Sequence, residues 1–184
     1  MPEIAMNIPL IKELDKVPLF KLSRRNASFY RTIFESLVVD HLIRPSLKNS
    51  ALKVLKGSII NGAGFSPEVD IIISTSTVFP ENVAEPFHKI GIVEYQAVKA
   101  VIKVEHWFHW NHIYEVREYF DDLAPYLPAK AKKLLIIGGL FPQVDPKEFD
   151  YCDEVFITWH KLNRKYKENF GGRYKKLIKT LNAL

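Results

Sequence analysis

Three charged residues in apolar, strand-like stretches are the first candidates for chemistry: Asp70, Lys103 and Glu105. Asp70 interrupts the β-branched run 69–74, and the other two lie in the apolar stretch 97–105. Side chains two apart on a strand point to the same face, so Lys103 and Glu105 share one. If the two strands are neighbours, a suitable register brings Asp70 within roughly 5 Å of Lys103 or of Glu105 at the Cβ level. Buried charge costs stability unless it is paired or holds a metal, which makes this group a candidate site.

Two carboxylates and one ammonium in a pocket are suited to metal-assisted hydrolysis of phosphodiester bonds. The carboxylate oxygens would hold Mg²⁺ or Mn²⁺. The metal would lower the pKa of a bound water, and the lysine would stabilise the developing charge. The same three residues also suit a structural salt bridge without catalytic function. The residue types alone leave both interpretations open.

The sequence predicts which elements position these residues. A broad apolar stripe at helical spacing runs from Asn26 to Pro45 and predicts a helix. Glu35 lies beside this stripe, where it could reach a neighbouring cleft or form an exposed pair with Arg31 one turn earlier. A second helix is predicted from 113 to 123. Strands are predicted at 51–60, 69–74, 97–105, 133–137 and 154–158, with 89–94 as a candidate for a further short strand. This order predicts an α/β fold with a mixed central β-sheet flanked by helices.

Length and composition predict one domain, 1–184, because 184 residues with 47% hydrophobic content suit a single core. Within it we expect an N-terminal arm or helix at 1–25, a core at 26–160 and a basic C-terminal helical segment at 161–184. The chain has one cysteine, no run of 18 apolar residues and no signal-peptide pattern, which indicates a cytoplasmic protein without membrane contact. Few glutamines beside plentiful lysine, glutamate and isoleucine are typical of a thermophile.

Charge permits an anionic partner without proving one, since 26 basic and 21 acidic residues give a net charge of +5. Lys99 shares a strand face with Lys103, and Lys165, Arg173 and Lys176 lie in the basic C-terminal segment. These four are candidates for contacts with the phosphates of nucleic acid, which are salt-sensitive and independent of sequence. The alternative for the C-terminal group is a solvated helical face.

Histidines and aromatic residues follow the strand at 97–105. His106, His109 and His112 are spaced by three, which is not a recognised zinc-ligand signature. Capping, or stacking with Trp107 and Trp110, is the favoured interpretation of these histidines. The tryptophans themselves fit either the core or a platform on which the bases of a single strand stack.

Five segments, in this order and spacing, resemble uncharacterised nuclease-like domains of the PD-(D/E)xK phosphodiesterase superfamily. They are 57–60, 62–65, 66–73, 78–81 and 98–105. The resemblance runs from the helix at 26 to the strand at 134, and it implies a restriction-endonuclease-like core and metal-dependent nuclease activity. By this resemblance Asp70 matches the metal-binding aspartate and Glu35 matches the catalytic glutamate of the first helix.

One motif departs from the superfamily pattern, because Lys103-Val104-Glu105 stands where acidic-x-Lys is usual. The reversal keeps the charges on one face but moves each by roughly 6.6 Å along the strand. In one hypothesis Asp70 and Glu105 hold Mg²⁺ or Mn²⁺, and Lys103 or Lys99 has the role of the lysine in the superfamily motif. The protein then cleaves nucleic acid, with DNA favoured over RNA. In the other, Lys103 neutralises both carboxylates, no metal binds, and the fold serves as a module that binds nucleic acid or a protein partner. The sequence leaves open a homodimer.

Overall fold

The computed structural model describes residues 27–62, 64–78, 90–108, 111–140, 146–162, 165–168 and 172–184. The arm or helix expected at 1–25 lies outside these residues, as do His109 and Trp110. Of the helices that are described, none combines the length and the apolar character needed to cross a membrane.

The helix predicted between 26 and 45 is present and contains a change of helical pitch. Helix α3 covers Ala27–Val38, the π-helical turn η1 covers Val39–Ile43, and α4 covers Arg44–Ser46. Phe34 and Leu42 are buried along one side of this continuous segment, as the apolar stripe predicts. After Ser46 the backbone becomes extended, and the helix ends there.

The central sheet joins eight strands among the described residues, in the order β2-β1-β3-β5-β6-β7-β8, with β4 paired to β1. The pairs β1–β3 and β3–β5 are antiparallel, whereas β5–β6 and β6–β7 are parallel, so the predicted mixed sheet is confirmed. The strands are β1 Lys53–Asn61, β2 Gly64–Phe65, β3 Val69–Ser74, β4 Ile90–Glu94, β5 Val98–Phe108, β6 Lys132–Leu140, β7 Glu154–Leu162 and β8 Lys165–Glu168.

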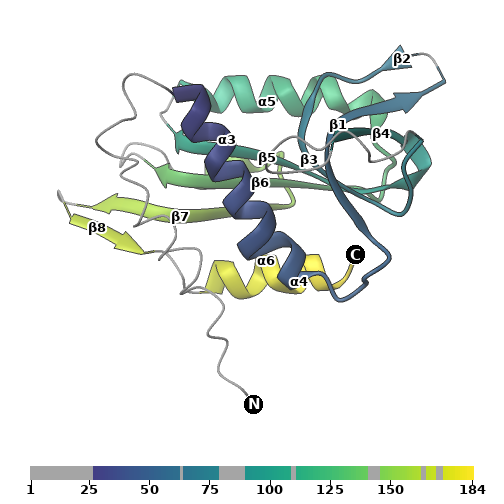
Figure 1. Ribbon diagram of the computed structural model, residues 1–184. Helices are drawn as coiled ribbons and strands as arrows, with labels where there is room; N and C mark the ends of the chain where they lie inside the picture. The colour runs from purple at the N-terminus through teal and green to yellow at the C-terminus, as the bar shows by residue number, and fades with distance from the viewer. Residues whose placement is uncertain are drawn as a thin grey trace.

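Helices cover both faces of the sheet (Figure 1). Helices α3 and α6 (Gly172–Asn182) pack on one face, and α5 (His112–Leu123) packs on the other. Alternation along β5 separates the two cores, because Ile102 faces the α3 side and Val101 faces the α5 side. The short 3-10 turns are η2 Tyr95–Ala97, η3 Ala124–Tyr126 and η4 Pro146–Phe149.

The C-terminal segment corrects one expectation, because it is not helical from residue 161. Strand β7 continues to Leu162 and pairs with β8 in an antiparallel ladder in which Lys161 faces Tyr166. The alternation Lys165-Tyr166-Lys167 has the period of two that suits a strand, and neighbouring β7 supplies the hydrogen-bonding partner. Only the last part, α6, keeps the expected helical structure.

A β-bulge shapes the strands that carry the charged group. Leu55 pairs with Ile72 but Gly57 pairs with Val69, so Asp70 and Ile71 of β3 together oppose Lys56 of β1. Bulges of this kind change the direction of side chains. Gly57 has φ +147°, and a Cβ atom there would lie 1.8 Å from the carbonyl oxygen of Gly91 in β4. Glycine therefore allows β4 to approach the backbone beside Lys56.

Candidate functional site

The four residues predicted to carry chemistry come together where α3, β3 and β5 meet. They are Glu35 from α3, Asp70 from β3, and Lys103 and Glu105 from β5. Arg31 of α3 joins them through direct contacts, and Lys56 of β1 joins them through Glu35. The site therefore combines three carboxylates with three cations.

Asp70 is the centre of this cluster, and its side chain is only 5% exposed. Its Oδ1 accepts a hydrogen bond from Arg31 Nη2 at 2.8 Å. Its Oδ2 accepts one from the backbone N–H of Val104 at 3.0 Å and lies 3.2 Å from Lys103 Nζ. Both carboxylate oxygens are therefore held by donors, two of which carry positive charge.

Lys103 lies between the two acidic residues proposed as metal ligands. Its Nζ is 3.2 Å from Asp70 Oδ2 and 3.5 Å from Glu105 Oε1. It also lies 4.5 Å from the centre of the Tyr119 ring on α5, an arrangement that favours a cation. The register explains this position, because Ile71 pairs with Ile102 and Asp70 lies one residue beyond that pair, opposite Lys103.

Glu35 is 1% exposed, so the pair that it forms with Arg31 is not the exposed helical pair allowed by the spacing alone. Arg31 Nε donates to Glu35 Oε1 at 2.9 Å. Lys56 Nζ lies 3.4 Å from Glu35 Oε2 and 3.0 Å from Glu68 Oε1. Arg31 thus links Glu35 to Asp70, and Lys56 links Glu35 to the exposed Glu68.

Burial changes the ionisation of the two glutamates. Burial, with a further contribution from Asp70, raises the pKa of Glu35, against the opposing effects of Lys56 and Arg31. Burial also raises the pKa of Glu105, against the opposing effects of Lys103 and Arg31. Both carboxyls consequently hold their protons to a higher pH than they would in the unfolded chain.

This raised pKa of Glu35 gives a testable pH dependence. Above the ordinary pKa of 4.5 the unfolded chain loses this proton first, so the folded state binds more protons until the pH passes the raised value. The free energy of unfolding of the native chain should therefore fall, relative to that of Glu35→Gln, as the pH rises from 4.5 through this window. Urea unfolding at several pH values measures the difference. The control variant Glu68→Gln retains Glu35, so its free energy of unfolding should fall with pH, relative to that of Glu35→Gln, as the native value does. If the difference in unfolding free energy between the native chain and Glu35→Gln does not change with pH, the pKa of Glu35 is not raised.

Three contributions to the site were missed by sequence reasoning. Arg31 contacts Asp70, which lies 39 residues later, and no local pattern predicts that contact. Lys56 lies opposite the β-bulge and turns toward Glu35, and the strand pattern alone does not predict that direction. Tyr119 belongs to the predicted second helix, but only the packing of α5 on β5 places its ring beside Lys103.

The residues proposed for contact with nucleic acid do not gather at this cluster. Lys99 is half-buried and lies in β5 at the point where the pairing with β3 shifts its register. The exposed Lys176 forms an ion pair with the half-buried Glu154, with 3.0 Å between Nζ and Oε2. Lys165 lies in β8 and Arg173 lies in α6. Their role stays a prediction.

The donor set of the cluster does not fit a divalent cation as it is arranged. Mg²⁺ and Mn²⁺ need carboxylate oxygens, but those of Asp70 are held by Arg31, Lys103 and the N–H of Val104. Within the described ranges no group of three or more His, Cys, Asp or Glu side chains is placed to hold a metal ion. The same finding offers no support for zinc at His106 and His112, while His109 lies outside the described residues.

Comparison with known proteins identifies the fold. No family model matches the chain, and no curated protein matches it. Among solved structures, the cAAA-bound form of NucC from E. coli MS115-1 has a TM-score of 0.61 at 12% identity, covering 96% of this chain and 89% of that one. The cAAA-bound NucC from P. aeruginosa ATCC27853 has a TM-score of 0.54 at 13% identity, covering 96% and 90%. The apo form of the E. coli protein has a TM-score of 0.53 at 14% identity, covering 93% and 91%. The chain therefore has the same fold as these NucC structures.

Proposed function

We propose that this chain is a nuclease-fold module that binds nucleic acid, DNA in preference to RNA, without cutting it. The observation that carries the proposal is that both carboxylate oxygens of Asp70 are occupied by contacts with Arg31, Lys103 and the backbone N–H of Val104. Lys103 occupies the position where the resembling superfamily has its acidic ligand. A metal ion there would meet an ammonium group where it needs a carboxylate.

The charge balance of the cluster supports the same conclusion. The three carboxylates Glu35, Asp70 and Glu105 are matched in number by the cations Arg31, Lys56 and Lys103, and Lys56 also pairs with the exposed Glu68. A carboxylate site that attracts a divalent cation needs an excess of negative charge. Here the ion pairs satisfy the buried charges within the protein itself.

A second candidate function is Mg²⁺- or Mn²⁺-dependent hydrolysis of phosphodiester bonds in DNA. Its support is the convergence of Glu35, Asp70 and Glu105 from three elements of a nuclease fold. It requires Lys103 and Arg31 to leave Asp70 when metal and substrate bind. In that case Asp70 and Glu105 are the metal ligands, and Asp70→Ala or Glu105→Ala abolishes cleavage.

Calorimetry with Mn²⁺ and a cleavage assay on plasmid, single-stranded DNA and RNA separate the two functions. We expect the native chain to show neither metal binding nor metal-dependent cleavage, and to behave in this respect like Asp70→Ala. Cleavage by the native chain that disappears in both Asp70→Ala and Glu105→Ala would overturn the proposal in favour of the hydrolase. Light scattering on the same samples measures whether the homodimer left open by the sequence forms.

Binding of DNA should depend on the exposed lysines of α6. Lys175 and Lys179 are exposed there, and each contact with a phosphate contributes about one unit to the slope of log K against log salt concentration. We expect Lys175→Gln and Lys179→Gln each to weaken binding to every duplex sequence and to reduce the slope by about one. Fluorescence anisotropy over a salt series measures both effects. Lys130→Gln, which removes an exposed lysine between η3 and β6, is the control and should leave the slope unchanged.

A further inference from the structure

The solvent-facing side of α5 carries carboxylates around an exposed aromatic ring. No ion pair links any of these carboxylates to another residue that the structure describes; they are Glu115, Glu118, Asp121 and Asp122. Tyr114 is 73% exposed, and the one exposed cation of this helix, Arg117, pairs with Asp150. Tyr114, Glu118 and Asp122 are spaced by four residues, so they form one stripe along the helix. Such a stripe repels nucleic acid and fits a cationic protein surface with a hollow for the tyrosine ring.

Helix α6 presents a surface of this kind. Lys175 and Lys179 are exposed and lie four residues apart. Lys176 pairs with Glu154, whereas no ion pair joins Lys175 or Lys179 to another described residue. A hollow of about 320 Å³ opens between the end of α6 and the first residues of β6 and β7. It is lined by Lys132, Glu154, Lys176, Lys179, Thr180, Ala183 and Leu184. Two cations are thus followed by a hollow with apolar atoms on one wall.

The two stripes match in one register when the helices run in opposite directions. Residues four apart are separated by about 6 Å along a helix axis. If Asp122 of one copy faces Lys175 of another, the same spacing sets Glu118 opposite Lys179. One turn further along, Tyr114 comes opposite the end of α6, where the hollow opens. A single register therefore allows two ion pairs and an aromatic contact together.

The two helices cannot meet within one chain, because α5 and α6 lie on opposite faces of the sheet (Figure 1). A contact between them joins two copies head to tail, and it leaves α5 free on one copy and α6 free on the other. Further copies then extend the assembly until a ring closes or a filament forms.

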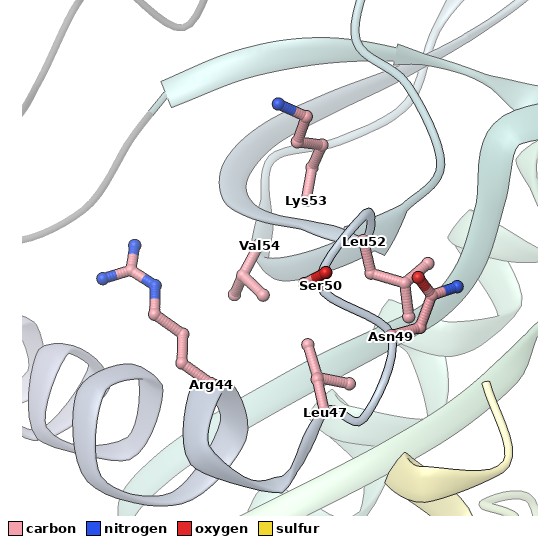
Figure 2. Close-up of a pocket in the computed structure, with 7 residues that line it drawn as sticks. All are labelled: Arg44, Leu47, Asn49, Ser50, Leu52, Lys53 and Val54. Carbon is pink, nitrogen blue, oxygen red and sulfur yellow. The ribbon is translucent and has the colours of Figure 1, made fainter.

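Exposed cations elsewhere do not form a comparable stripe. Among the helices that the structure describes, only α6 shows two exposed lysines or arginines one turn apart. At the hollow between α4 and β1, Arg44 and Lys53 come from different elements, and Figure 2 shows Lys53 projecting away from Val54. Arg44 Nη1 also lies 2.6 Å from Asp40 Oδ1. Within the described part of the chain, α6 is therefore the helix that matches the α5 stripe.

We infer that a second copy of this chain docks here, with α5 of one copy lying antiparallel to α6 of the next. Opposite charges at matched spacing fix the register, and the tyrosine ring adds buried contact area. Lys175 and Lys179 are also the proposed contacts with DNA, so duplex DNA and a second copy compete for the same lysines. The self-association itself does not depend on DNA binding, because both of its surfaces belong to the protein.

Sedimentation velocity of the full chain over a concentration series, without DNA, tests the contact. We expect the average mass to rise beyond that of two chains with increasing concentration. It should fall again at about 1 M salt, because screening weakens exposed ion pairs. The double variants Glu118→Lys/Asp122→Lys and Lys175→Glu/Lys179→Glu should each weaken self-association by at least about tenfold, since like charges then face each other.

Mixing the two double variants separates this contact from general charge effects. The α5 helix of the Lys175→Glu/Lys179→Glu variant is native and matches the native α6 of the other variant, so the mixture should associate as the native chain does. Both variants keep a net positive charge, because the native net charge is +5 and the two reversals in α6 remove four units of it. The control Glu94→Lys reverses an exposed carboxylate of β4, outside both helices, and should leave self-association unchanged.

Unchanged urea midpoints in the double variants would show that loss of association is not loss of folding, since all four side chains are exposed. Four results would each overturn the inference. They are a native mass of one chain at millimolar concentration, a plateau at the mass of two chains, no association in the mixture, and an equal loss of association in Glu94→Lys.

Discussion

Exchanging two charges on β5, in the double variant Lys103→Glu/Glu105→Lys, is expected to create a Mn²⁺ site that the native chain lacks. The Lys103 ammonium now lies 3.2 Å from Asp70 Oδ2. A carboxylate at position 103 would place two acidic groups side by side, as hard divalent cations require. The ammonium introduced at position 105 would lie two residues further along the same strand face.

The exchange also predicts a stability signature. Without metal, the two adjacent carboxylates repel each other and the variant is less stable than the native chain. With Mn²⁺ at 100 times its dissociation constant, the free energy of unfolding of the variant should rise by about 2.7 kcal/mol. Thermal unfolding with and without Mn²⁺ measures this rise, and plasmid cleavage measures any gain of activity.

A charge exchange on the surface is the matched control. Arg117 and Asp150 form an exposed pair with a separation of 3.2 Å, so Arg117→Asp/Asp150→Arg reverses two charges away from the cluster. We expect this control and the native chain to show no Mn²⁺-dependent change in unfolding. Mn²⁺ binding by the native chain as tight as that of the β5 exchange would contradict the view that Lys103 closes the site.

Removing the Lys103 ammonium alone is expected to destabilise the fold strongly. The Lys103 side chain is 11% exposed, and Lys103→Met would leave Asp70 and Glu105 with less compensating charge in a buried environment. Breaking one side of a buried ion pair typically costs about 3 to 5 kcal/mol, and we expect about 3 kcal/mol because Arg31 still contacts Asp70. Urea unfolding at pH 7 measures the loss.

Two further variants test the cause of this destabilisation. Lys99→Met removes a half-buried lysine from the same strand and should cost less than about 1 kcal/mol. Asp70→Asn/Lys103→Met removes both partners, so part of the lost stability should return. If Lys103→Met and Lys99→Met cost the same, the ion pair with Asp70 does not stabilise the fold.

Strand patterns carried most of the fold information in this sequence. The β-branched run at 69–74 and the apolar run that begins at 97 predict two buried strands, and both are present as the neighbours β3 and β5. Strand alternation placed Lys103 and Glu105 on one face, whereas the approach of Asp70 to Lys103 also required the observed antiparallel pairing of β3 with β5. The strand at Lys165–Glu168 was missed because a short basic segment becomes a strand only when β7 offers it hydrogen bonds.

By itself, the sequence determined the mixed α/β fold and placed Lys103 and Glu105 on one strand face, because side-chain alternation and apolar periodicity are local properties. Only the tertiary structure decided what happens to those charges. The path of α3 across the sheet brings Arg31 to Asp70, and the bulge opposite Lys56 turns that lysine toward Glu35. Contacts between residues far apart in the chain depend on packing, which no local pattern encodes. Packing is therefore what turned three residues suited to binding a metal into a closed network of ion pairs.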